Sequence, residues 1–163
     1  MASGDTLLIF TVLANEPPSS NYATIGTVNS HPVLRFDQTT QEEARFSGIM
    51  PRHYGGGGIT VYVHWMAATT TTGTIGWDIS LERLSDGTTD LDSDSYASAQ
   101  AITPATVPGA DGQVSITNVA ISSGANMDNV VAGDLFRLRI RRDVANDNTA
   151  GDAELLAIEI KET

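Results

Sequence analysis

The sequence Ile-Thr-Val-Tyr-Val-His-Trp at residues 59–65 is followed, after a short gap, by Thr-Ile-Gly-Trp-Asp-Ile-Ser-Leu-Glu-Arg-Leu at residues 74–84. In both stretches apolar residues recur at every second position, which is the pattern of a β-strand with one buried face. Trp65 and Trp77 belong to the apolar faces, so we expect both indoles to anchor the core. Residues 69–73 consist of Thr and Gly and predict a turn, so we interpret the pair as an antiparallel hairpin.

Similar β-rich runs lie on both sides of this pair. They are predicted at residues 6–13, 22–28, 33–36, 43–50, 113–122, 135–140 and 153–160, whereas the Ala-rich residues 96–107 are ambiguous. Two sets of apolar residues compete for the inner face of the run at 113–122, so we expect a bulge near Asn118. Residues 125–131 have the spacing of a short helical turn. The chain is therefore predicted to be all-β, an antiparallel, jelly-roll-like β-sandwich of about eight to ten strands.

Length and charge restrict the class of protein. With 163 residues the chain fits one domain, so we expect residues 1–163 to form a single β-sandwich, with residues 1–20 as an N-terminal arm or docking strand. Nine Lys and Arg against twenty Asp and Glu give a net charge of −11, which argues against a nucleic-acid partner. The absence of Cys excludes a disulfide framework. No apolar run approaches the roughly 18 residues of a membrane span, so we expect no membrane partner.

Three motifs contain residues that other proteins use for chemistry. Asp90, Asp92 and Asp94 alternate as at the start of a calcium loop, but the required glycine and glutamate are missing, so we interpret them as a solvated acidic loop. The three histidines lack the spacing of a metal site, and the glycines at 55–58 lack the Gly-Lys-Ser/Thr ending of a phosphate loop. We therefore assign no catalytic, cofactor-binding or metal-binding residue, and we expect no cofactor and no enzymatic activity.

Arginines and tyrosines supply the candidate binding residues. Arg137, Arg139 and Arg141 share one face of the strand predicted at 135–140 and its continuation. Aligned arginines form good bidentate pairs, so we expect their partners to be carboxylates of this chain or of an acidic neighbouring subunit. Tyrosines stack on sugar rings in carbohydrate-binding modules, and Tyr62 is the tyrosine placed most firmly in a strand.

Four further motifs stand out along the chain. They are Asn-Glu-Pro-Pro at 15–18, Asn-Ser-His-Pro-Val-Leu at 29–34, Pro-Arg-His-Tyr-Gly-Gly-Gly-Gly-Ile-Thr-Val at 51–61 and Ala-Gly-Asp-Leu-Phe-Arg-Leu at 132–138. With this combination the chain resembles the jelly-roll capsid decoration, or cement, proteins of tailed bacteriophages. The resemblance implies a homotrimer on the outer capsid surface of the virion, where it locks neighbouring major capsid proteins. The alternative is a phage fibre or receptor-binding domain that shares the fold and binds carbohydrate.

Partner contacts are expected on three parts of the chain. The interface residues are Leu8, Phe10, Pro17 and Pro18 in the N-terminal segment, Tyr62 and His64 on the face opposite Trp65, and Arg137, Arg139 and Arg141 in a patch that meets the capsid. A closed trimer suits this role because its symmetry matches a three-fold axis of a capsid.

Overall fold

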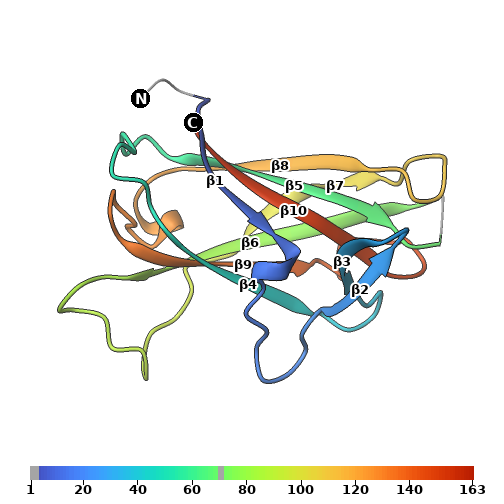
Figure 1. The fold of residues 1–163 in the computed structure, drawn as a ribbon, viewed down its shortest axis with the longest axis horizontal. Helices are drawn as coiled ribbons and strands as arrows, with labels where there is room; N and C mark the ends of the chain where they lie inside the picture. Colours follow the sequence, from blue (N-terminus) through green and yellow to red (C-terminus); the bar gives the residue numbers. More distant parts are fainter. Residues whose placement is uncertain (1–3, 70–71) are drawn as a thin grey trace.

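The computed structural model describes residues 4–69 and 72–163 and shows two packed β-sheets (Figure 1). Within these residues the strands are β1 (Thr6–Thr11), β2 (Thr24–Val28), β3 (His31–Phe36), β4 (Glu43–Ile49), β5 (Ile59–Ala67), β6 (Thr74–Leu84), β7 (Gln100–Thr106), β8 (Ser115–Ile121), β9 (Leu135–Arg142) and β10 (Ala153–Glu162). The helical elements of the described residues are the 3-10 turns η1 (Val12–Ala14) and η2 (Ala125–Met127), and none of these residues forms a helix that could span a membrane. The prediction of an all-β, jelly-roll-like sandwich is confirmed.

The strand order places the chain in two antiparallel layers. The six-stranded sheet has the order β2-β3-β10-β5-β8, with β1 pairing to β10 on the same side as β3. Strands β1 and β3 share that side because β3 pairs with the start of β10 and β1 with its end. The four-stranded sheet has the order β4-β9-β6-β7. Figure 1 shows β8, β5 and β10 in one layer and β6 and β9 in the other.

The core lies between the sheets and contains both tryptophans, as expected. Trp65 and Trp77 are fully buried, and the ring of Phe36 meets Trp77 edge-on at 5.0 Å between centroids. The predicted hairpin of residues 59–65 and 74–84 is wrong, because β5 pairs with β8 and β10 whereas β6 pairs with β7 and β9. Alternation identifies the buried face of a strand but not the strand that pairs with it. Two strands in facing sheets both turn their apolar faces to the core, so they show the same alternation as two strands paired in one sheet.

Strand β8 departs from the sequence prediction in register. It pairs with β5 without interruption from Ser115 to Ile121, so the bulge expected near Asn118 is absent. Thr117 faces inward, where its hydroxyl accepts a hydrogen bond from the Trp65 indole at 3.1 Å. Ile116 consequently points outward and is 55% exposed. The same register buries Ile121 and packs Val119 against the core, so two apolar residues and the indole hydrogen bond together favour this facing over the burial of Ile116.

The N-terminal segment packs on its own chain. Strand β1 pairs with β10, and Phe10 lies in the core with its ring stacked on Phe46 at 5.5 Å between centroids. Residues 15–23, called the strap here, then run along the free edge of β4. The Glu16 amide donates to the Arg45 carbonyl at 2.8 Å, and the Ala23 amide donates to the Glu43 carbonyl at 3.0 Å. The strap therefore satisfies backbone groups that an exposed edge strand would leave unpaired.

Candidate functional site

The outer surface of the four-stranded sheet is lined by charged side chains. Alternation along three adjacent strands sends one set of residues into the core and the other to this surface. The outward set is Glu43, Arg45 and Ser47 from β4, Arg137, Arg139 and Arg141 from β9, and Asp78, Ser80 and Glu82 from β6. The strand register places each arginine of β9 between one residue of β4 and one of β6. We call this surface, together with Asp94 and Tyr96 of the following loop, the charged face.

Arginines of the charged face lie beside carboxylates of the same chain, as expected from the sequence. Arg141 donates two hydrogen bonds to Asp78, at 2.9 and 3.1 Å. Arg137 lies less favourably, with its nitrogens 3.5 Å from the Glu16 carboxylate and 3.6 Å from the Glu82 carboxylate. These two separations exceed those of normal charged hydrogen bonds. Part of the hydrogen-bonding capacity of this face is therefore unused.

Tyr96 covers the centre of the charged face. It belongs to the loop of residues 85–99, which projects from one end of the sandwich and returns where the Ala97 amide donates to the Leu81 carbonyl at 2.7 Å (Figure 1). The guanidinium carbons of Arg45 and Arg139 lie 5.6 and 4.5 Å from the ring centroid, which is cation–π geometry. Burial raises the pKa of the Tyr96 hydroxyl to about 12. Tyr96 is therefore held as a neutral phenol against two cations.

Five buried polar atoms gather at the same place without hydrogen-bond partners among the described residues. They are Glu82 Oε2, Asp94 Oδ2, Tyr96 Oη, Arg137 Nε and Arg139 Nε. Burial raises the pKa of Glu82, with Arg137 opposing the shift, and burial lowers the pKa of Arg139. Buried polar groups in proteins are normally hydrogen-bonded, and leaving one unpaired costs about 1–3 kcal/mol. The cluster therefore contains both donors and acceptors whose hydrogen-bonding capacity is unused among the described residues.

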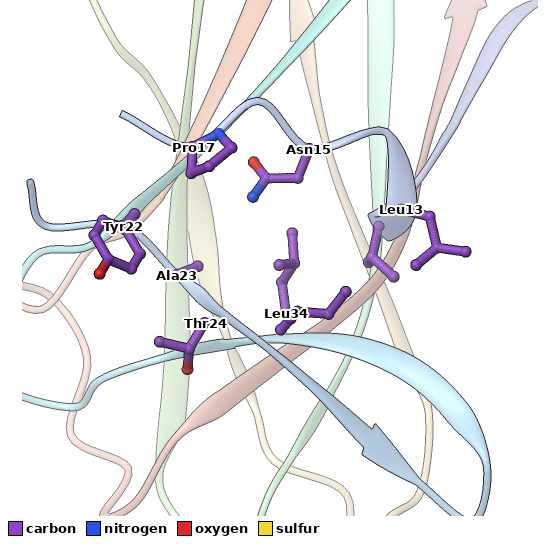
Figure 2. Close-up of a pocket in the computed structure, with 9 residues that line it drawn as sticks. Leu13, Asn15, Pro17, Tyr22, Ala23, Thr24 and Leu34 are labelled. Carbon is purple, nitrogen blue, oxygen red and sulfur yellow. The ribbon is translucent and has the colours of Figure 1, made fainter. Parts of the chain in front are cut away.

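A hollow lies beside the strap. This edge pocket has a volume of about 400 Å³ and is lined by Val12, Leu13, Asn15, Pro17, Tyr22, Ala23, Thr24, Ile25 and Leu34. Figure 2 shows the Asn15 amide pointing into the hollow, with Leu13 and Leu34 on its walls. Tyr22 is 47% exposed and Ile25 63% exposed. The lining is mostly apolar, and polar groups are too few for a polar ligand to be held there.

The predicted interface residues do not meet in one place. Phe10 is inside the chain's own core and Leu8 packs against it. Pro17 lines the edge pocket, and neighbouring Pro18 is half-buried. The remaining five lie on two opposite outer surfaces, with Tyr62 and His64 half-buried on the six-stranded sheet and Arg137, Arg139 and Arg141 on the charged face.

Sequence reasoning missed the residues that complete the charged face. Asp78, Ser80 and Glu82 alternate visibly in the sequence, and this polar set could have been matched with the arginine row. Tyr96 is one of the four tyrosines that could stack on a sugar ring, but no periodicity singles it out because it lies in a polar loop.

Comparisons with known proteins give matches in structure alone. No protein-family model and no curated protein matches the chain. The carbohydrate-binding and catalytic modules (CBM22-1–GH10) of Clostridium thermocellum xylanase 10B, solved with xylohexaose, match 100% of this chain at a TM-score of 0.54 and 14% identity. The chain spans only 29% of that structure.

Two isolated modules match over nearly their whole length. The CBM22-2 xylan-binding domain of Paenibacillus barcinonensis Xyn10C matches at a TM-score of 0.53 and 14% identity, covering 93% of each chain. The xylan-binding module CBM15 matches at a TM-score of 0.50 and 9% identity, covering 96% of this chain and 97% of its own. At these identities the likeness shows a shared β-sandwich fold.

Proposed function

We propose that this chain is a non-catalytic carbohydrate-binding domain that holds a neutral glycan on the charged face. The observation that carries the proposal is the mixture of unpaired atoms around Tyr96. Arg137 and Arg139 each offer an N–H donor, whereas Glu82 and Asp94 each offer a carboxylate acceptor. A sugar hydroxyl both donates and accepts hydrogen bonds, so adjacent hydroxyls of one sugar ring can satisfy both kinds of atom.

The charge of the face favours a neutral ligand. Four carboxylates (Glu43, Asp78, Glu82, Asp94) and four guanidiniums (Arg45, Arg137, Arg139, Arg141) give 4 − 4 = 0, and Glu16 at the edge beside Arg137 brings the sum only to −1. A phosphate or a uronate would accept from the arginines but leave both unpaired carboxylates without donors and repel them. A cation would leave the guanidinium donors unpaired. Neutral hydroxyls, which both donate and accept hydrogen bonds, meet both requirements.

Access to the unpaired atoms runs beneath the loop of residues 85–99. Asp94 and Tyr96 of this loop pack on the sheet and cover the unpaired atoms of the charged face. A glycan enters between this loop and the sheet, so that Asp94 and Tyr96 contact it from one side and Arg137 and Arg139 from the other, and the loop shifts outward to admit it. The long loop suits this movement because chain segments with few packed contacts open at low free-energy cost.

Support for the proposal also comes from the fold. The three structures reported above include two xylan-binding modules and one two-module structure, CBM22-1–GH10, solved with xylohexaose. This is support by analogy of fold, which hosts many functions, so the chemistry of the charged face carries the argument. The decoration role, the trimer, the major capsid protein as partner and the virion location remain predictions from the sequence resemblance. A glycan-binding face agrees best with the alternative of a fibre or receptor-binding domain.

The test is calorimetric titration with neutral oligosaccharides of xylose, mannose and glucose, and with an oligouronate for contrast. We expect saturable binding of a neutral oligosaccharide, weakened about 10- to 100-fold in Arg137→Met, because hydrogen bonds to charged groups contribute about 1.5–3 kcal/mol. The matched control is Lys161→Met, since Lys161 lies over the Tyr62 ring on the opposite sheet at 5.6 Å. Tighter binding of the oligouronate, or equal binding by both variants, would overturn the proposal.

A further inference from the structure

Besides the edge pocket, another hollow lies on the outer side of the six-stranded sheet, opposite the sheet that carries the charged face. It has a volume of about 500 Å³ and is lined by Val28, Arg35, Met66, Ala68, Thr69, Asp111, Gly112, Asp152 and Glu154. Its lining comes from strands β2, β3, β5 and β10, from the loop between β7 and β8, and from the loop residues that directly follow β5 and directly precede β10. We call it the acidic pocket, because three carboxylates, those of Asp152 and Glu154 and that of Asp111 from another loop, line it together with a single guanidinium.

Glu154 is the central residue of the acidic pocket. The strand register places it between Arg35 on β3 and Met66 on β5, and both neighbours also line the pocket. The residue is only 1% exposed. Its Oε1 accepts a hydrogen bond from Arg35 Nε at 2.8 Å, whereas Oε2 is buried without a hydrogen-bond partner among the described residues. A buried carboxylate oxygen without a donor is costly, so the pocket lacks a donor at this point.

The charge of the pocket indicates the kind of donor. Asp111, Asp152 and Glu154 carry three negative charges against one positive charge on Arg35, which gives 1 − 3 = −2. An anion would be repelled, and a neutral hydroxyl would leave this charge uncompensated. No group of three or more His, Cys, Asp or Glu in the described part of the chain is arranged to hold a metal ion. An organic cation with N–H donors fits these conditions.

We propose that the acidic pocket binds a primary alkylammonium group, as carried by a free diamine or by a lysine side chain. The ammonium donates to Glu154 Oε2, and Asp111 and Asp152 supply the remaining negative charge. Met66, Val28 and Ala68 form an apolar wall beside these carboxylates, against which an alkyl stem packs. Lysine-like ligands combine these two features, a strongly hydrated charge and a flexible apolar stem.

The test is NMR titration of the full chain with n-pentylammonium chloride, following the Met66 methyl resonance. We expect a saturable shift that 1-pentanol does not reproduce, since the alcohol has the stem without the charge. Asp111→Asn should weaken binding about two- to fivefold, as expected for one partly screened charge. Both Asp111 and the control residue Asp92 are exposed, so Asp92→Asn changes the net charge equally without touching the pocket.

Glu154→Gln should abolish the shift of the Met66 methyl resonance. This substitution also removes the ion pair with Arg35, so thermal denaturation checks that the variant is folded. Should this variant fail to fold, the Asp111 and Asp92 pair decides the outcome. Equal binding by these two variants, or equal shifts from the alcohol and the ammonium, would overturn the proposal. A comparison of 1,5-diaminopentane with N-acetyl-lysine amide then identifies the source: tighter binding of the diamine indicates a free polyamine, and tighter binding of the amide indicates a lysine side chain.

Discussion

Arg142 at the end of β9 is fully buried and uses all five of its N–H donors. Two of them bond to Asp147, at 2.5 and 3.0 Å. The other three go to main-chain carbonyls, those of Phe36 at 3.2 Å, Thr149 at 2.9 Å and Gly151 at 2.7 Å. The guanidinium thereby joins β3 to the loop between β9 and β10. We predict that the hydrogen bonds of Arg142 contribute more to the free energy of unfolding than those of any other polar side chain among the described residues.

The perturbation is Arg142→Met, which keeps much of the side-chain volume but removes every donor. It leaves the Asp147 carboxylate buried without its cation, which costs about 3–5 kcal/mol. Three buried carbonyls also lose a donor, each at about 1 kcal/mol or more. The expected loss is therefore at least about 5 kcal/mol, a large part of the total stability of a small domain. The assay is equilibrium unfolding in urea, followed by the fluorescence of the two buried tryptophans.

The control is the neighbouring arginine. Arg141 pairs with the buried carboxylate of Asp78, but its side chain is 24% exposed and it bonds to no main-chain carbonyl among the described residues, so Arg141→Met should cost less, about 3 kcal/mol. Arg142→Met combined with Asp147→Leu should recover only part of the loss, because the three carbonyls remain unpaired. Equal effects of the two arginine substitutions, or full recovery in the double variant, would refute the reasoning.

Two further predictions concern the backbone and acid stability. Gly58 has a φ of +111°, and a Cβ there would lie 2.8 Å from the Ile121 carbonyl oxygen, so Gly58→Ala should destabilise by about 1–3 kcal/mol in urea unfolding. Gly57→Ala should be nearly neutral, since its nearest neighbour would lie 3.9 Å away. Hydrogen bonds from Thr40 and Thr39 lower the pKa of Asp37 to about 2 from 3.8. Its ionised form therefore stabilises the fold above pH 3.8, and the stability advantage of the wild type over Asp37→Asn in thermal melts should shrink as pH falls toward 2.

The fold was predictable where the period of the sequence determines the buried face. Residues 74–84 were predicted with the bounds that β6 has in the structure, and both tryptophans were placed in the core. The pairing of residues 59–65 was not predictable in the same way, because alternation carries no information about which strand lies beside which. The inward face of β8 carries Thr117, Val119 and Ile121, and the contact of Thr117 with Trp65 joins residues 52 positions apart, which the local pattern does not reveal.

The sequence predicts the arginines of the candidate site but not the residues that surround them. The arginine row on β9 followed from alternation, and so did its expected pairing with carboxylates of the chain. Glu82 becomes a partner of Arg137 only through the pairing of β6 with β9. Tyr96 reaches the face from a loop, and loop residues have no periodicity from which their direction could be derived. Burial of unpaired atoms is likewise a property of the assembled sandwich.

The central claim is that a neutral glycan binds at the charged face, and an NMR titration tests both the binding and its place. Neutral oligosaccharide is added to isotope-labelled protein while the ring signals of Tyr96, Tyr62 and Tyr22 and the Nε–H signal of Arg137 are followed. We predict saturable shifts at Tyr96 and Arg137, with Tyr62 on the opposite sheet and Tyr22 at the edge pocket unchanged. Shifts confined to Tyr62 or Tyr22, or no shift at saturating oligosaccharide, would contradict the claim.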